Sequence, residues 1–224
     1  MAATPTIGTL RESSLHASLK ELYARPGDEL EAVREGYVVD LARPDELVEF
    51  QTGGFGRMRP KLEALLERHH VRVVYPVAVE RMLVRIDGDG VVTSRRRSPV
   101  RGCHLSVFDE LVSLPLLAVH PRLTFEIVLV RVEEHRVDAP RTRSRRKPWR
   151  IVDRLLLEVV ETRAMDIAGV LPAELDDPFT AAELAHALAI PADLARRVAY
   201  TLCGAGIVEQ CGKQGRAYAY ARVA

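Results

Sequence analysis

A carboxylate inside an apolar run constrains this chain more than any other feature of its sequence. Asp40 lies in the stretch Tyr37-Val-Val-Asp40-Leu41, which is typical of a β-strand. Burying an unpaired carboxylate costs several kcal/mol. The strand must therefore fold so that Asp40 meets a partner or a bound cation.

A second strand with polar positions follows shortly. The turn residues Arg43-Pro44-Asp45 separate it from the first, and it runs from Leu47 to Gln51. A period of two places Glu49 and Gln51 on one face, about 6.6 Å apart along the strand. If the two strands form a hairpin, Asp40 and Glu49 converge at the same edge of the sheet.

The two carboxylates form a candidate site for a hard cation. Together with a backbone carbonyl and water they suit Mg²⁺ or Mn²⁺. Such an ion polarises a phosphoryl oxygen and lowers the pKa of an attacking water, as phosphodiester hydrolysis requires. The Gln51 amide would orient that water or the phosphate, but it cannot supply a positive charge. The alternative interpretation is a plain hairpin with acids on its solvated face.

The surrounding pattern predicts a mixed α/β arrangement. A helix is expected from about Leu10, with Leu15, Leu19 and Leu22 on one face, and Pro26-Gly27 ends it. After the hairpin, a glycine-rich stretch at 52–56 leads to a second helix, expected at about 59–70. The continuous apolar run at 71–75 predicts a strand that is covered on both faces.

In this setting the acidic pattern resembles the PD-(D/E)XK nuclease superfamily. Its signature is an acid on one strand and acid-x-lysine on the next. Asp40 and Glu49 match the acids, while Gln51 stands where lysine is usual, a variant known from some restriction enzymes of this fold. Over residues 10–86 the resemblance implies a restriction-endonuclease-like αβββαβ core, Mg²⁺-dependent hydrolysis and a nucleic-acid substrate. It also implies an upstream glutamate, for which Glu31 is preferred over Glu21, Glu29 and Glu35.

The C-terminal residues predict a separate module. Thr180 and Glu183 have the spacing of a capping box, and a helix follows to about Ala189. A second helix is expected at 192–203, stopped by glycine, and the segments 207–211 and 217–221 predict a two-stranded wing. From about 178 to 223 the order resembles a winged helix-turn-helix, in which the second helix enters the DNA major groove.

Several basic residues are candidates for DNA binding. On the second helix of this module we expect Arg196, Arg197, Tyr200 and Thr201 to face outward, and Arg can read guanine or hold phosphate. Further candidates for phosphate contacts are Lys213 and Arg216 at the wing tip and Lys20, with His16, on the first helix. The alternative is a module used for packing or dimerisation.

Two arginine-rich runs strengthen the expectation of a nucleic-acid partner. One comprises Arg95, Arg96, Arg97 and Arg101. The other is a polar arm at 139–150, in which Arg145 and Arg146 would track DNA while Trp149 stacks on a base. A solvated loop would have the same composition.

Composition limits the remaining choices. Apolar residues make up 47% and charged residues 28% of the 224 residues, so a packed core is expected. The formal net charge of +1 supplies no global attraction to DNA, so binding must come from local patches. No apolar run approaches the roughly 20 residues of a membrane span, and residues 1–10 do not have the pattern of a secretory signal. Three scattered cysteines, Cys103, Cys203 and Cys211, fit plain thiols in a reducing cytoplasm, although a Cys203–Cys211 pair stays open.

The expected organisation is a nuclease-like domain at 1–138, the basic arm at 139–150, and a connecting segment with the winged helix at 151–224. The expected function is a Mg²⁺- or Mn²⁺-dependent DNA endonuclease, and cutting both strands would need two sites and therefore a dimer. One alternative is a non-catalytic DNA-binding regulator on a degenerate nuclease fold. The other is a protein-interaction module without nucleic acid.

Overall fold

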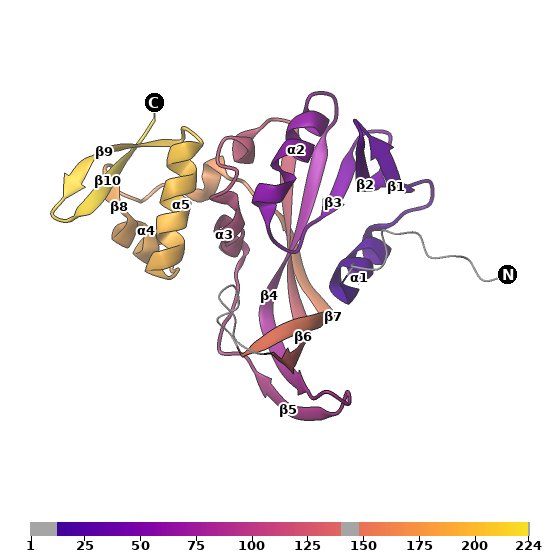
Figure 1. Cartoon of the computed structure of the whole chain (residues 1–224). Helices are drawn as coiled ribbons and strands as arrows, with labels where there is room; N and C mark the ends of the chain where they lie inside the picture. Colours follow the sequence, from indigo (N-terminus) through magenta and orange to yellow (C-terminus); the bar gives the residue numbers. More distant parts are fainter. Residues whose placement is uncertain (1–12, 140–147, 224) are drawn as a thin grey trace. The chain divides into compact units, whose positions relative to one another are not determined.

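The computed structural model describes residues 13–139 and 148–223. The chain forms two compact units, each built from segments that are distant in the sequence. Among the described residues, unit 1 comprises 13–28, 76–103, 128–139 and 148–162, and unit 2 comprises 29–75, 104–127 and 163–223. Long strands run from one unit into the other (Figure 1). Within the described residues, no helix is long and apolar enough to cross a membrane.

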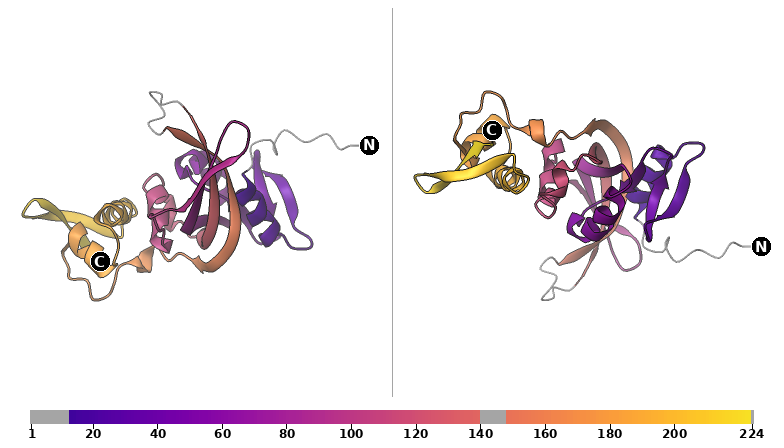
Figure 2. Two further views of the ribbon diagram at one scale, coloured as in Figure 1. Left: turned by 90° about the horizontal axis from the view of Figure 1, so that it is seen from below. Right: turned by 90° about the horizontal axis from the view of Figure 1, so that it is seen from above.

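The fold is mixed α/β, and its main sheet has seven strands in the order β1-β2-β3-β4-β6-β7, with β5 paired to β4 (Figures 1 and 2). These strands are β1 (Glu29–Arg34), β2 (Tyr37–Ala42), β3 (Leu47–Phe50), β4 (Val71–Ile86), β5 (Val92–Arg97), β6 (Leu123–Asp138) and β7 (Trp149–Ala164). The first three are antiparallel neighbours, whereas β3 and β4 are parallel. A parallel pair needs a crossover, and α2 (Arg59–Leu66) provides it.

The remaining helices of this part are short. Ser13 caps α1 (Ser14–Tyr23), and its hydroxyl accepts from the His16 N–H at 3.4 Å. The others are the 3₁₀ turns η2 (Phe55–Met58), η3 (His104–Val107) and η4 (Leu117–Val119) and the single-turn helix α3 (Phe108–Leu111). In unit 2, the buried Phe55 ring stacks on Phe125 at 5.8 Å and meets Tyr75 edge-on at 5.1 Å. This aromatic cluster anchors the loop between β3 and α2.

Several elements differ from the sequence-based expectation. The αβββαβ resemblance implies a third strand before the second helix, but no range was predicted for β1, because its sequence Glu29-Leu-Glu31-Ala-Val-Arg34 is polar. The arginine-rich run at 95–97 is part of the exposed strand β5, where pairing with β4 satisfies the backbone. The helix α2 ends at Leu66, so His69 and His70 follow it rather than close it.

The expected domain boundary after residue 150 was wrong. Strand β7 (Trp149–Ala164) is hydrogen-bonded to β6 and closes one side of the main sheet. Residues 151–162 therefore belong with the preceding strands of unit 1. Continuous β-ladder hydrogen bonding overrides the local cue of a polar arm.

The C-terminal module follows the 3₁₀ turn η5 (Ala168–Val170) and has a small sheet of its own, in the order β8-β10-β9. Its elements are β8 (Phe179–Thr180), α4 (Ala181–Ala187), α5 (Ala192–Gly204), β9 (Val208–Gln214) and β10 (Ala217–Arg222). The expected capping box is present: the Glu183 N–H donates to the Thr180 hydroxyl, and the Thr180 N–H donates to the Glu183 carboxylate. Thr201 was expected to face outward but is fully buried, because α5 also packs against α3.

Gly102 offers a test of the packing in unit 1. A Cβ at this position would lie 2.5 Å from Val77 Cγ1 and 2.9 Å from the Ala78 carbonyl oxygen. Because the second contact is to backbone, relief requires a main-chain shift. We expect Gly102→Ala to lower the free energy of unfolding by about 1–3 kcal/mol in urea denaturation. Gly88→Ala is the matched control, since nothing lies within 4 Å of its Cβ position. Equal stability of the two variants would contradict this packing.

Candidate functional site

The register of β2 and β3 brings Asp40 and Glu49 together. The ladder pairs Leu41 with Val48 and Ala42 with Leu47, so the next pair along it is Asp40 with Glu49. Directly opposed residues point to the same face of an antiparallel pair. The Phe50 N–H donates to Asp40 Oδ2 at 2.9 Å, which holds the Asp40 carboxylate at the end of β3.

Glu49 is a buried carboxyl group with a strongly perturbed pKa. It is only 5% exposed. Burial is the main cause that raises its pKa to about 7, the nearby Asp40 charge adds to the rise, and attraction to Lys61 opposes it. A carboxyl group that titrates near neutrality and faces a second carboxylate is unusual outside functional sites.

Lys61 is a member of this site that the sequence did not reveal. It lies in the first turns of α2, and its Nζ is 2.5 Å from Glu49 Oε1. The same ammonium group donates to the Val38 carbonyl oxygen at 2.6 Å. The only available signal was its place on the helix that follows β3, since a crossover helix covers the face of the strands it connects. The helical periodicity of α2 predicts only that Lys61 lies at the edge of the buried face that contains Leu62.

Gln51 is hydrogen-bonded to the start of the glycine-rich loop. Its backbone N–H donates to the Val74 carbonyl oxygen at 3.0 Å, and its side-chain amide donates to the carbonyl oxygen of Gly53. Residue 51 lies just past the end of β3, where the chain turns into the glycine-rich loop. The predicted role of Gln51 in orienting water or phosphate stays a prediction, and its amide is already bonded to the Gly53 carbonyl oxygen.

The upstream glutamates do not join the two acids. The ladder pairs on either side of Glu31, Leu30 with Leu41 and Ala32 with Val39, place it opposite Asp40, but Glu31 is exposed and its φ is positive. Glu29 pairs with Arg34 at 2.6 Å, and Glu35 lies 3.3 Å from His69 Nε2. Glu21 is exposed on α1, in unit 1.

The residues present fit a divalent cation held by two protein carboxylates. Across the residues with described positions, no group of three or more acidic, histidine or cysteine side chains forms a closed metal cage. Mg²⁺ does not need one, because it keeps several waters and takes one or two carboxylates plus substrate phosphate. The buried Glu49 Oε1 has no well-directed hydrogen-bond donor among those residues, so its contact with Lys61 is an ion pair only. A metal ion at this oxygen would have to displace the Lys61 ammonium.

The basic residues of the C-terminal module are partly engaged. On α5, Arg196 pairs with Asp193, and Arg197 pairs with Asp109 of α3 at 3.1 Å. The end of α5 also lies close to the segment after α3, since a Cβ on Gly204 would lie 2.7 Å from Pro115 Cβ. On the wing, Lys213 lies 5.3 Å from the centre of the Tyr218 ring, and Arg216 is exposed.

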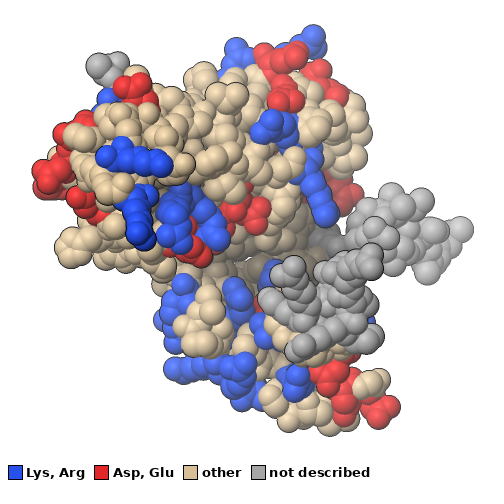
Figure 3. Space-filling view, turned by 60° about the vertical axis from the view of Figure 1, so that its left-hand side comes forward, with Lys and Arg blue, Asp and Glu red and all other residues tan. Residues whose placement is uncertain are grey.

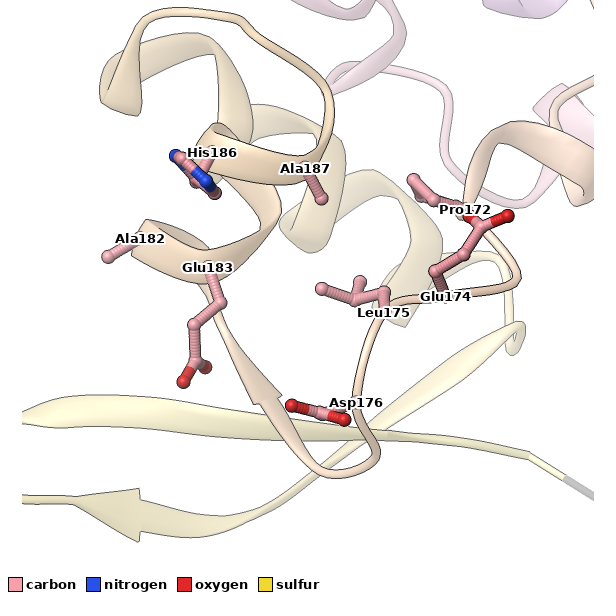
Figure 4. Close-up of a pocket in the computed structure, with 8 residues that line it drawn as sticks. All are labelled: Pro172, Glu174, Leu175, Asp176, Ala182, Glu183, His186 and Ala187. Atoms are coloured by element: carbon pink, nitrogen blue, oxygen red, sulfur yellow. The ribbon is translucent and has the colours of Figure 1, made fainter.

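A pocket of about 530 Å³ lies between α4 and the loop that precedes it. Figure 4 shows Leu175 of this loop pointing towards α4. The lining contains the acids Glu174, Asp176 and Glu183 and no lysine or arginine. The negative charge disfavours nucleic acid on this side of the module.

The remaining expected binding residues belong to unit 1 or lie outside the described residues. Lys20 and His16 are half-buried on α1, in unit 1. Arg145 and Arg146 lie outside the described residues, so their proposed contact with DNA stays a prediction.

Comparison with known proteins places the chain in a family. The family described as "Domain of unknown function (DUF8091)" matches residues 13–166. A protein of Treponema pallidum (strain Nichols), described as an uncharacterized protein, is 37% identical over 186 residues, which cover 81% of this chain and 74% of that protein. No solved structure matches the chain. The matched range begins before α1 and ends just after β7, in agreement with the inclusion of β7 in the main sheet. The chain belongs to the DUF8091 family, and residues 13–166 are its family domain.

Proposed function

We propose that this protein is a metal-dependent DNA endonuclease with a restriction-endonuclease-like core and a C-terminal winged helix. The observation that carries the proposal is the meeting of Asp40 of β2, Glu49 of β3 and Lys61 of α2. The order α1-β1-β2-β3-α2-β4, with β3 and β4 parallel, supports it as the αβββαβ arrangement of that fold.

The chemistry follows from two acids and one cation. Asp40 and Glu49 would hold Mg²⁺ or Mn²⁺, which when bound polarises the scissile phosphate and acidifies a water. Lys61 supplies the positive charge that Gln51 lacks, and it can stabilise the negative charge that develops on the phosphate. Ionised Glu49 attracts the Lys61 ammonium, so Lys61 would move towards the phosphate only when a metal ion takes its place at the carboxylate. The positive charge would thus come from Lys61 of α2 and not from position 51 after β3.

The C-terminal module supports a duplex DNA substrate. Its order of two helices followed by a hairpin is that of a winged helix. Arg196, Tyr200, Lys213 and Arg216 are exposed on α5 and the wing. Each phosphate that such a cation neutralises would steepen the log–log salt dependence of binding by about 0.9. Cleavage of both strands would take two copies of the chain.

One observation favours a non-catalytic DNA-binding regulator as a second candidate. The Lys61 ammonium lies against the Glu49 oxygen that a metal ion would need, and an ion pair in that position would suit a site without metal. Arg197 is also paired with Asp109, so the face of α5 next to α3 serves packing.

The proposal is tested by incubating supercoiled plasmid with the full chain and Mg²⁺, Mn²⁺ or EDTA. We expect nicked and linear products with either metal and none with EDTA. Asp40→Asn should lack cleavage, whereas Asp45→Asn, at an exposed acid in the adjoining turn, should cleave like the wild type. DNA retardation with no cleavage, and no rise in melting temperature with either ion, would establish the regulator instead.

A further inference from the structure

A small, strongly basic pocket lies in unit 1, at the β4–β5 hairpin. Its volume is about 130 Å³. Three arginines, a serine and the indole of Trp149 form its polar lining over the buried Leu83 and Val84; the arginines are Arg85, Arg96 and Arg136, and the serine is Ser94. Its arginines are among the basic side chains coloured blue in Figure 3.

A buried carboxylate fixes one of these arginines in place. Glu134 is fully buried, and its Oε1 accepts from Arg136 Nε at 2.7 Å and lies 2.6 Å from Arg136 Nη2. Its Oε2 accepts from Arg154 Nε at 2.9 Å, and Arg81 Nε lies 3.8 Å away. Burial raises the pKa of Glu134, but the hydrogen bonds from Arg154 and Arg136 outweigh it, so the pKa lies below its ordinary value. The Glu134 carboxylate thus holds Arg136 and Arg154 in place.

Trp149 completes the clamp on Arg136. The guanidinium carbon of Arg136 lies 3.6 Å from the centre of the Trp149 ring, a cation–π contact that fixes the guanidinium plane. The Nε and Nη2 atoms of Arg136 face the Glu134 carboxylate. Among the described residues, the Nη1 atom of Arg136 remains for another acceptor. The guanidinium is therefore oriented before any ligand arrives.

The other two arginines add charge at the mouth of the pocket. Arg85 is half-exposed and pairs with Asp138 at 3.1 Å. Arg96 is exposed and forms no ion pair within the described part of the chain. Ser94 and Arg96 are two apart on β5 and share a face, while Arg95 and Arg97 pair with Glu133 and Glu80. Guanidinium groups converging with a hydroxyl are the donor set of a phosphate site.

We propose that this pocket binds a phosphoryl group. Its volume corresponds to about four water molecules, enough for one phosphate and too little for a nucleoside. The phosphate source is a DNA backbone or a free phosphate compound. The DNA backbone as the source rests on the proposed function, because a nuclease also contacts phosphates other than the one it cleaves.

Trp149 makes the test direct, because it is the only tryptophan in the chain and it lines the pocket. Its fluorescence would be followed while inorganic pyrophosphate or a 20-base-pair DNA duplex is added to the full chain at low salt, in EDTA. Calorimetry in parallel detects binding that leaves the emission unchanged. We expect saturable binding and a change in Trp149 emission with at least one ligand, and about tenfold weaker binding in Arg96→Gln.

Arg97→Gln is the matched control, because it removes the same charge from the next residue of β5. A response to the duplex that Arg96→Gln weakens and Arg97→Gln preserves assigns the pocket to DNA. The same pattern with pyrophosphate only assigns it to a free phosphate compound. No binding of either ligand, or equal losses in the two variants, overturns the proposal. Because no divalent ion is present, this result is independent of whether Asp40 and Glu49 support cleavage.

Discussion

Lys61→Met is expected to lower the rate of metal-dependent DNA cleavage by roughly 10²- to 10³-fold, the usual effect of removing one preorganised electrostatic group. Methionine keeps the length of the side chain and removes its charge. Attraction to Lys61 is the largest influence that lowers the pKa of Glu49. Without it the pKa rises further above 7, so the remaining activity should require a more alkaline pH. Plasmid cleavage measured from pH 6 to 9 gives both the rate and its pH profile.

The shift of the pH profile separates a role in the site from a role in folding. Arg57→Met is the matched control, since Arg57 is an exposed cation on the preceding 3₁₀ turn. It should leave the rate and the profile unchanged. A Lys61→Met protein that cleaves at the wild-type rate with the wild-type pH profile would remove Lys61 from the site. If Lys61→Met loses activity but its remaining activity keeps the wild-type pH profile, Lys61 has a structural role through its hydrogen bond to the Val38 carbonyl oxygen.

The second large effect is on stability, and it does not depend on catalysis. The pKa of Glu49 is about 7 in the folded chain against an ordinary value of 4.5. Below pH 4.5 both states hold the proton, and the full stability is present. Between pH 4.5 and 7 only the folded state keeps it, so the free energy of unfolding falls as the pH rises. Above pH 7 the loss is complete, at roughly 3 kcal/mol.

Glu49→Gln replaces the carboxyl group with a neutral group of the same shape and should abolish this dependence. We expect the variant to match the wild type near pH 5 and to exceed it by up to roughly 3 kcal/mol at pH 8. Urea denaturation at the two pH values provides the measurement. Glu63→Gln, at an exposed glutamate on α2, should behave like the wild type. The change in the free energy of unfolding between pH 5 and pH 8 is compared in the wild type and in Glu49→Gln. An equal change in the two proteins would show that Glu49 does not titrate near neutrality.

The sequence predicted the local features well, because each depends on residues close together in the chain. The strands around Asp40 and Glu49 lie within a residue of their expected bounds. The capping box at Thr180 and Glu183, the two helices that follow and the hairpin after them are present as well. Alternation of apolar side chains, capping and glycine punctuation are local signals.

The sequence by itself therefore determined the order of the elements and the facing of Asp40 and Glu49, since a tight hairpin fixes its own register. Only the tertiary structure decided which cations meet those acids and which arginines are already engaged. Lys61 reaches Glu49 across 12 residues, Arg136 and Arg154 converge on Glu134 from two strands, and Arg197 pairs with Asp109 across 88 residues. Long charged side chains pair wherever packing brings their ends together, and no periodicity in the chain records that meeting.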